Sequence, residues 1–219
     1  SDAITPGTAR SYLWGEEVKT SSALAYVGFN EKGDREKDDF YPTPPMATES
    51  LLEREKFEGN IWECACGNGA MSKVMIDKGY EVYSSDLIDR GYGETGIDFL
   101  KSDKKFDNII TNPPFNLSTE FTLQSFKLAR KKVVMLSKIS YLEGIKRREQ
   151  IFNQKKLKKV YVFSRRVPFK KESTQKLAGG LMAFGWFIYD VNYNGLPEVD
   201  WIWAYSLLGI EISYLIKSY

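Results

Sequence analysis

The chain has 219 residues, 42% of them hydrophobic, which suits one α/β domain with extensions. No stretch reaches the roughly 20 apolar residues of a membrane span, and the nearest, Ile202–Ile216, carries Glu211. Two cysteines, Cys64 and Cys66, and no histidine argue against a zinc site, a disulfide framework and histidine-based catalysis. We therefore expect a cytoplasmic protein with no membrane contact and no metal.

The net charge of +2 conceals an uneven distribution. The segment Lys146–Lys176 holds twelve Lys or Arg and two Glu, so it carries +10 and the remaining chain carries −8. Such a block favours a surface for an anionic partner. The alternative is a set of solvated helix and strand faces.

The first 45 residues divide into two parts. Residues 1–39 lack sustained periodicity and hold a charge run, so we expect an N-terminal extension, partly disordered or packed on the domain. The proline-rich segment Phe40–Pro45 then forms a rigid, extended entry. It leads into a predicted helix over Met46–Lys56, with Thr43 as the candidate N-terminal cap.

Residues 61–86 predict one βαβ unit that binds a nucleotide-like ligand. Asp86 follows the second strand, 19 residues after Gly67, close to the spacing of about 20 expected for an acid that binds ribose hydroxyls. The alternative is an ordinary turn in which Asp86 caps a helix. The predicted parts are the strand Ile61–Cys64, the glycine turn Ala65–Gly69, the helix Ala70–Lys78 closed by Gly79, and the strand Tyr80–Ser85.

The segment Asn112–Phe115, with the sequence Asn-Pro-Pro-Phe, follows a predicted buried strand over Asp107–Thr111. Its two prolines make a stiff loop at the carboxyl end of that strand, where open α/β sheets bind ligands. The amide can accept a hydrogen bond from an amine, and the ring can stack on a flat heterocycle. This pairing suggests a site for the exocyclic amine of a base. The alternative is a Pro-Pro turn with a buried Phe.

The rest of the chain continues to alternate strands and helices, which predicts a mostly parallel sheet with helices on both faces. An Asn194-Gly195 turn signal predicts a late antiparallel hairpin. The predicted elements are an edge strand Thr95–Phe99, a helix from a Ser118 cap to Arg130, a strand Lys132–Ser137, a helix Glu143–Gln154, a strand Leu157–Phe163, a basic loop Arg165–Gly180, and strands Leu181–Val191 and Val199–Trp203.

These motifs together resemble one family, the S-adenosylmethionine-dependent adenine-N6 DNA methyltransferases, and among them the small phage and mobile-element enzymes. The resemblance implies a Rossmann-like class I methyltransferase domain over residues 40–205, with a seven-stranded, mostly parallel sheet whose final strand is antiparallel. Residues 206–219 would form a C-terminal tail. The markers, in the family's order, are Tyr41–Pro45, Glu63–Gly69, Asp86, Asp98-Phe99 and Asn112–Phe115.

The resemblance implies S-adenosyl-L-methionine as cofactor and S-adenosyl-L-homocysteine as product. The implied cofactor residues are Tyr41, Pro42 and Thr43 at the methionine end, Glu63, Cys64, Ala65, Gly67 and Gly69 at the amino acid moiety, Asp86 at the ribose, Asp98 and Phe99 at the adenine, and also Leu87 and Asn112.

The same resemblance implies the catalytic roles. The Asn112 side chain and the Pro113 carbonyl would accept the N–H groups of the target amine, and Phe115 would stack on the extruded base. Many relatives have Tyr in place of Phe115, and Phe keeps the stacking face. Phe169 is the candidate for the opposite wall of the base pocket, and a core aromatic is the alternative. The basic loop supplies the candidate phosphate-binding residues Arg165, Arg166, Lys170 and Lys171.

Three functions remain open at this point. The first is methylation of DNA adenine, with nucleic acid as the partner. The second is methylation of RNA adenine or of protein glutamine, and the basic block disfavours only the protein substrate. The third is a cofactor-binding or nucleic-acid-binding module without turnover, against which the intact Asn112 argues. The sequence predicts neither a recognition site nor an oligomeric state.

Overall fold

The computed structural model describes residues 40–169 and 182–202. The expectations for residues 1–39, for residues 170–180 of the basic loop, for Leu181 at the start of the next predicted strand and for the tail lie outside the described residues. No helix in the described ranges is long and apolar enough to cross a membrane.

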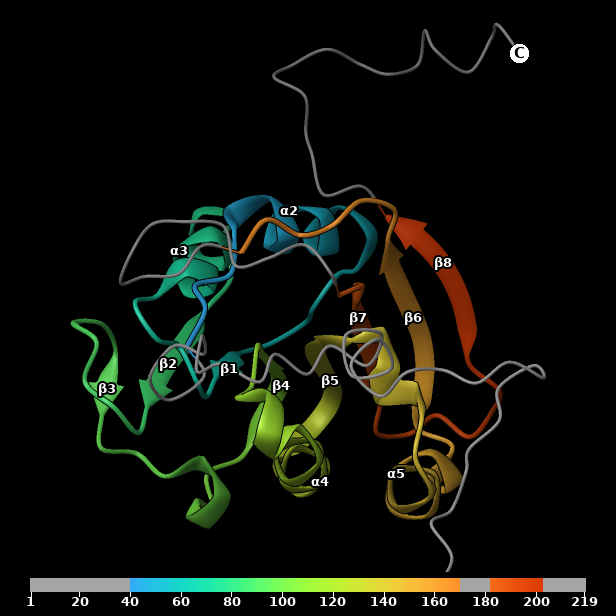
Figure 1. Ribbon diagram of the computed structural model, residues 1–219. Coiled ribbons are helices and arrows are strands. Elements are labelled where there is room, and N and C mark those ends of the chain that lie inside the picture. Colours follow the sequence, from blue (N-terminus) through green and yellow to red (C-terminus); the bar gives the residue numbers. More distant parts are fainter. Residues whose placement is uncertain (1–39, 170–181, 203–219) are drawn as a thin grey trace, which may run out of the picture. The chain divides into compact units, whose positions relative to one another are not determined.

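A single eight-stranded sheet forms the centre of the domain, in the order β3-β2-β1-β4-β5-β7-β6-β8 (Figure 1). Strand β7 runs antiparallel to both of its neighbours, β5 and β6. All other pairs of neighbouring strands in the sheet are parallel. The strands are β1 Ile61–Glu63, β2 Val82–Asp86, β3 Glu94–Thr95, β4 Phe106–Thr111, β5 Ala129–Lys138, β6 Leu157–Phe163, β7 Phe184–Asp190 and β8 Glu198–Ile202.

The first seven strands confirm the expected sheet, with β7 as its antiparallel member. The expected hairpin of the last two strands is wrong, because β8 pairs in parallel with β6. β5 and β6 already pair with the two edges of β7, so β8 cannot pair with β7. It pairs instead with the outer edge of β6 and becomes the eighth strand of the sheet. The expected edge strand Thr95–Phe99 is also too long. The Asp98 side chain accepts from Leu100 N, which starts the 3₁₀ helix Phe99–Lys101.

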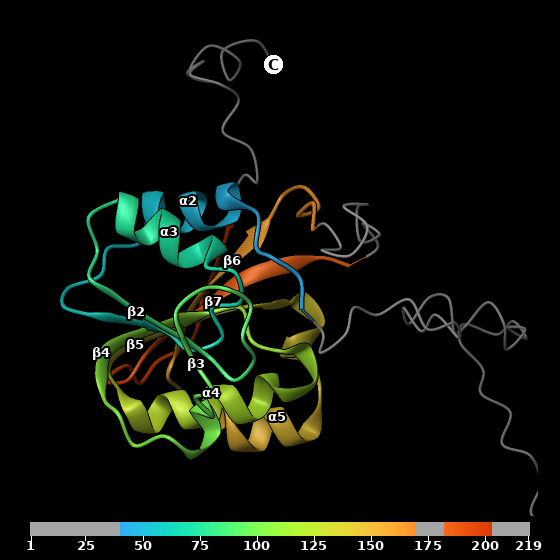
Figure 2. The same ribbon diagram turned by 90° about the vertical axis from the view of Figure 1, so that its left-hand side faces the viewer.

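Helices cover both faces of the sheet, as predicted. α2 (Pro45–Arg54) and α3 (Ala70–Asp77) lie on one face, and α4 (Ser118–Leu128) and α5 (Ile145–Gln150) on the other (Figures 1 and 2).

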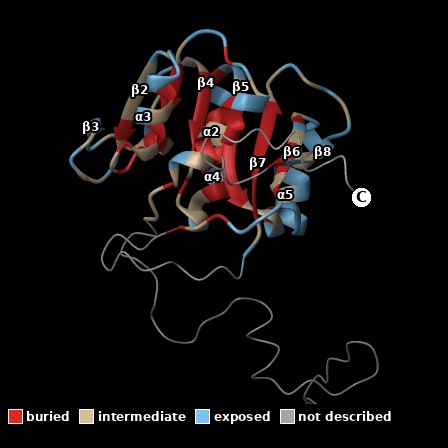
Figure 3. Ribbon diagram, turned by 90° about the horizontal axis from the view of Figure 1, so that it is seen from above, coloured by how far each residue is buried: buried red, intermediate tan, exposed pale blue. Residues whose placement is uncertain are grey.

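The central strands β4, β5 and β7 are buried on both faces (Figure 3). Their side chains alternate between two cores. On β5, Val134 and Leu136 join the core under α2 and α3, while Val133 and Met135 join the core on the opposite face. Such two-sided burial explains the apolar runs Val133–Leu136 of β5 and Trp186–Tyr189 of β7.

Three predicted helix starts and ends are corrected. The N-cap of α2 is Pro44, so Thr43 is not the cap, and its hydroxyl has another partner described below. Ser118 is the first residue of α4 rather than its cap, and its hydroxyl donates to the Phe115 carbonyl at 3.0 Å. The helix predicted over Glu143–Gln154 is divided into α5 and a 3₁₀ turn, Phe152–Gln154.

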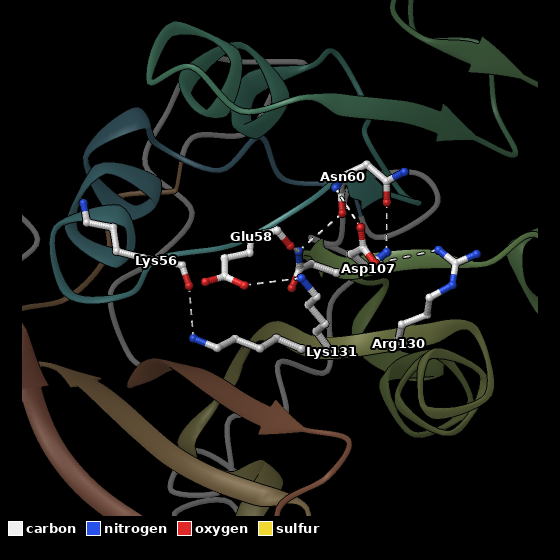
Figure 4. A network of polar contacts seen from close by, with 8 residues as sticks. Lys56, Glu58, Asn60, Asp107, Arg130 and Lys131 are labelled. Carbon is white, nitrogen blue, oxygen red and sulfur yellow. Dashed lines mark hydrogen bonds and ion pairs between the residues drawn. The ribbon is translucent and has the colours of Figure 1, made fainter.

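A polar network ties the amino ends of β1, β4 and β5 together (Figure 4). Asp107 N donates to Asn60 Oδ1 at 2.9 Å, and Asn60 N donates to Asp107 Oδ2 at 3.3 Å. Arg130 adds an ion pair to Asp107 at 3.8 Å. This network joins residues at the amino ends of β4 and β5, whereas the Asn-Pro-Pro-Phe loop follows the carboxyl end of β4.

Candidate active site

Three sequence motifs meet at the carboxyl edge of the sheet. The glycine turn follows β1, Asp86 ends β2 and the Asn-Pro-Pro-Phe loop follows β4, and these three strands are adjacent in the order β2-β1-β4. Parallel strands present their carboxyl ends at one edge, so residues far apart in the sequence come together there.

The Asn112 amide has a fixed orientation. Its Nδ2 donates to Thr43 Oγ1 at 3.0 Å and to the Tyr41 carbonyl at 3.4 Å. A carbonyl only accepts hydrogen bonds, so the nitrogen rather than the oxygen must face Tyr41. The Oδ1 atom is buried and has no hydrogen-bond partner among the described residues. A buried acceptor without a partner is costly in a folded protein, and this one is suited to receive a donor from a ligand.

An aromatic cluster surrounds Phe115 at the start of the 3₁₀ helix Phe115–Leu117. Tyr41 stacks nearly parallel to Phe115, with ring centroids 6.3 Å apart, and Phe184 of β7 lies 5.5 Å from it. Phe169 is only 4% exposed and packs on Phe184 at 4.8 Å. Phe184 is thus the ring of β7 that contacts Phe115, a role that the strand pattern of the sequence did not indicate.

The glycine turn is closely covered by aromatic rings. Gly67 has φ +54°, and a Cβ on it would collide with the ring of Phe40, while a Cβ on Gly69 would collide with the ring of Tyr92. Only glycine permits such an approach with this backbone. Phe40 and Tyr92 therefore border the glycine turn, and no motif of the sequence pointed to Tyr92.

Asp86 holds the glycine turn in place. Its Oδ2 accepts from Gly67 N at 2.8 Å, and its Oδ1 accepts from Ile88 N at 3.0 Å. A carboxylate offers about four lone-pair sites, so the two backbone bonds leave acceptor capacity for ribose hydroxyls. The adjacent Leu87 is 60% exposed and presents apolar surface beside the acid.

Glu63 ends β1 and is only 1% exposed. Ser72 Oγ of α3 donates to its Oε2 and lies 2.6 Å from Ser84 Oγ of β2. Burial raises the pKa of Glu63 from 4.5 to about 8, the hydrogen bonds from Ser72 oppose that rise, and the charge of Asp86 adds to it. At neutral pH Glu63 is therefore mainly a neutral hydrogen-bonding group.

Neither cysteine of the turn is a nucleophile in this environment. Burial raises the pKa of the Cys64 thiol well above its ordinary value, and it raises the pKa of the Cys66 thiol to about 12. Since the thiolate is the reactive form, both thiols act as packing groups at neutral pH. In the described part of the chain, no cluster of histidine, cysteine, aspartate or glutamate is suited to hold a metal ion.

Asp98 and Phe99 differ in how accessible they are. Asp98 pairs with Lys101 at 2.9 Å, and this hydrogen bond lowers the pKa of its carboxyl. Phe99 is 2% exposed and packs 5.0 Å from Trp62 and 4.9 Å from Phe121. The Phe99 ring thus belongs to the core behind this edge, and contact with a cofactor adenine stays a prediction for both residues.

Two residues of the basic loop, Arg165 and Arg166, are exposed and follow the carboxyl end of β6. β4 is parallel to β5, and both β5 and β6 are antiparallel to β7. β6 therefore runs in the same direction as β4, and the carboxyl ends of the two strands lie at the same edge of the sheet. Lys170 and Lys171 lie outside the described residues.

No family model and no curated protein matches the sequence. Solved structures do match. A putative class I S-adenosylmethionine-dependent methyltransferase from Listeria monocytogenes has a TM-score of 0.55 at 14% identity, over 82% of this chain and 71% of that chain. A putative RNA methyltransferase from Pyrococcus horikoshii has a TM-score of 0.51 at 17% identity, over 79% and 98%. A modification subunit of a putative type I restriction enzyme from Vibrio vulnificus has a TM-score of 0.50 at 12% identity, over 87% and 51%.

These likenesses establish the fold. The chain has the Rossmann-like fold of the class I S-adenosylmethionine-dependent methyltransferases, with one strand added beyond β6.

Proposed function

We propose that this protein transfers a methyl group from S-adenosylmethionine to the N6 amine of adenine in DNA. One observation carries the proposal: the Asn112 amide is held by its nitrogen, so that its unpartnered oxygen is available to an amine, three residues before the Phe115 ring. An amine acceptor beside an aromatic ring is the combination that a flat, amino-bearing base requires.

The residues of the turn suit the cofactor. The Gly67 N–H holds Asp86 in place, Asp86 keeps acceptor capacity for ribose hydroxyls, and Leu87 offers exposed apolar surface for the adenine. Tyr41 and Thr43 border the methionine end next to Asn112. When bound, S-adenosylmethionine supplies an electrophilic methyl group on a sulfonium, which is already a good leaving group.

The protein's task is then to position and activate the amine. The lone pair of an aromatic amine is delocalised into the ring, which makes it a poor nucleophile. Asn112 Oδ1 and the Pro113 carbonyl accept its two N–H groups and favour a pyramidal nitrogen with a localised lone pair. This interaction strengthens toward the transition state and so raises kcat. The product nitrogen loses its extra proton to water, and no strong base is required.

A base within a duplex must leave the stack to reach Asn112, and stacking on Phe115 offsets part of that cost. The exposed cations after β6 support an anionic polymer as substrate rather than protein. RNA adenine is the second candidate. One fold neighbour is described as a putative RNA methyltransferase, and another as a restriction-enzyme modification subunit.

Product analysis tests the proposal. The protein is incubated with cofactor carrying a labelled methyl group and, separately, with unmodified duplex DNA, single-stranded DNA, RNA of the same sequence, and protein. We expect the label in DNA. After digestion to nucleosides it should be recovered as N6-methyl-2′-deoxyadenosine. Asn112→Ala should abolish it, while Asn116→Ala, an exposed asparagine of the same loop, should not. Label recovered only in RNA, cytosine or glutamine would overturn the DNA adenine assignment.

A further inference from the structure

Strand β5 extends beyond the end of β4. The register pairs Thr111, the last residue of β4, with Met135, so residues 136–138 of β5 run past the point where the Asn-Pro-Pro-Phe loop begins. Lys138 is the last residue of β5 and pairs with Phe184 across the antiparallel ladder to β7. This register places a lysine level with the aromatic cluster.

The Lys138 ammonium contacts the ring that is proposed to stack on the substrate. Its Nζ lies 4.7 Å from the centroid of the Phe115 ring, within the range of a cation–π interaction. Phe184, the register partner of Lys138, contacts the same ring at 5.5 Å. Phe115 thus contacts both a ring of β7 and a cation of β5.

Lys138 lies on the substrate side of the site rather than the cofactor side. In the sheet order, the glycine turn and Asp86 belong to β1 and β2, on one side of β4. Lys138 belongs to β5, on the other side of β4, toward β6 and the cations Arg165 and Arg166. Its charge is therefore placed with the groups proposed to receive nucleic acid.

We propose that Lys138 is a substrate-positioning residue: its ammonium leaves the face of Phe115 when the target base stacks there, and it then binds the phosphate that flanks the target nucleotide. This role rests on the proposed function and adds a residue to it. A lysine is a compact point charge on a flexible four-carbon stem, so rotation of the side chain can carry its ammonium from the ring to a phosphate. The cation–π contact keeps the lysine at the site until substrate arrives.

A phosphate contact has a signature that packing lacks. Each phosphate neutralised by a cation releases condensed counterions, so the slope of log affinity against log salt changes by about one unit per contact. We expect Lys138→Ala to reduce this slope for duplex DNA by about one unit and to weaken binding several-fold at low salt. Lys138→Arg should keep the slope, because it keeps the charge.

The matched control is Lys131→Ala. Lys131 is on the same strand, near its other end, where it pairs with Glu58 at 3.4 Å. Its removal changes the net charge equally but should leave the slope unchanged. Affinity for S-adenosylmethionine, measured by calorimetry, should stay the same in all three variants.

Separate outcomes identify what fails. A wild-type slope that Lys138→Ala leaves unchanged would overturn the role of Lys138 and leave the proposed function standing. Weaker cofactor binding in Lys138→Ala with an unchanged slope would assign the lysine to the cofactor carboxylate and would overturn the phosphate contact. A wild-type protein without salt-dependent affinity for nucleic acid would overturn the proposed function itself.

Discussion

At the scale of single residues, the orientation of Asn112 depends on Thr43. The Thr43 hydroxyl accepts from Asn112 Nδ2 at 3.0 Å, and a neutral hydrogen bond of this kind contributes about 1 kcal/mol. We therefore expect Thr43→Val to loosen the amide and to lower kcat roughly fivefold. The amide should keep part of its orientation, because the Tyr41 carbonyl still accepts from its nitrogen.

Thr48→Val is the matched control for this change. Thr48 is fully buried on α2, and its hydroxyl has no hydrogen-bond partner within the described ranges. Its replacement should leave the rate unchanged. Steady-state kinetics on both variants decide the matter, and an equal slowing of the two would show that packing around α2, rather than the Asn112 contact, controls the rate.

Glu63 should make stability depend on pH. Its pKa rises from 4.5 to about 8 in the folded protein because of burial. Between these values the unfolded chain has released the proton and the folded protein retains it, so stability falls as pH rises through this window. The loss is on the order of 1.4 kcal/mol per pH unit at most. Below the lower value both states are protonated, and the contribution is fully present.

The glutamine side chain of Glu63→Gln does not titrate, so residue 63 should contribute no pH dependence to the free energy of unfolding of this variant. Urea unfolding at pH 5.5 and 7.5 measures the effect, because the variant should gain stability relative to the wild type at the higher pH. An identical difference between the two proteins at both pH values would show that the buried carboxyl is already ionised in the folded state.

The local sequence was sufficient to predict the position of site residues that lie at the end of a predicted strand. Asp86 ends β2 and Asn112 follows β4, so both are at the carboxyl edge, as expected. Phe184 and Lys138 could not be found in this way. Their contact with Phe115 depends on the register between β5 and β7, which links residues about 46 positions apart and is fixed only by tertiary packing.

At the scale of elements, Tyr141 links the 3₁₀ turn Ile139–Leu142 after β5 to α4. Its hydroxyl donates to the Ser118 carbonyl at 3.2 Å and lies 3.0 Å from Thr122 Oγ1. We expect Tyr141→Phe to lower the free energy of unfolding by about 0.5–1.5 kcal/mol, the net contribution of a buried hydrogen bond. Chemical denaturation measures it.

Tyr189→Phe provides the comparison within the same core. Tyr189 is fully buried, and its hydroxyl lacks a partner in the part of the chain that the structure describes. Its removal should leave the stability unchanged or raise it, because a buried polar atom without a hydrogen bond is unfavourable. Equal destabilisation by the two variants would contradict the difference in hydrogen bonding.

The hydrophobic pattern of the sequence predicted which segments form strands, but it did not predict which strands pair with each other. The sequence pattern predicted strands at β4, β5 and β7, and all three strands contribute buried side chains to the cores on the two faces of the sheet. The turn signal at Asn194-Gly195 predicted a hairpin, yet β7 has no free edge for one. Pairing is a property of the whole sheet, which a local turn cannot reveal.

At the scale of the whole molecule, the charge asymmetry predicts how nucleic acid binds. Neutralising four cations of the basic loop should weaken binding uniformly across sequences and reduce the salt slope by about one unit per lost phosphate contact. Cofactor affinity should stay the same, because that site is built at β1, β2 and β4. The residues to change are Arg165, Arg166, Lys170 and Lys171.

The comparison set removes four cations near the amino ends of the strands, opposite to the site. Binding of one duplex and one single strand at several salt concentrations compares the two sets. A larger loss of slope in the comparison set would place the nucleic-acid surface away from the carboxyl edge. These control residues are Lys56, Lys105, Arg130 and Lys131.

The most direct measurement of the central claim is the single-turnover rate of methyl transfer by Asn112→Ala, with cofactor affinity measured in parallel. The amide binds the amine more strongly as the nitrogen becomes pyramidal, so its loss should fall on the chemical step. The rate should drop by roughly 100-fold or more, as when one group that binds developing charge is removed. Cofactor affinity should stay within a few-fold of the wild type. Methylated adenine formed at a near wild-type rate would contradict the assignment of Asn112 as the amine-binding residue.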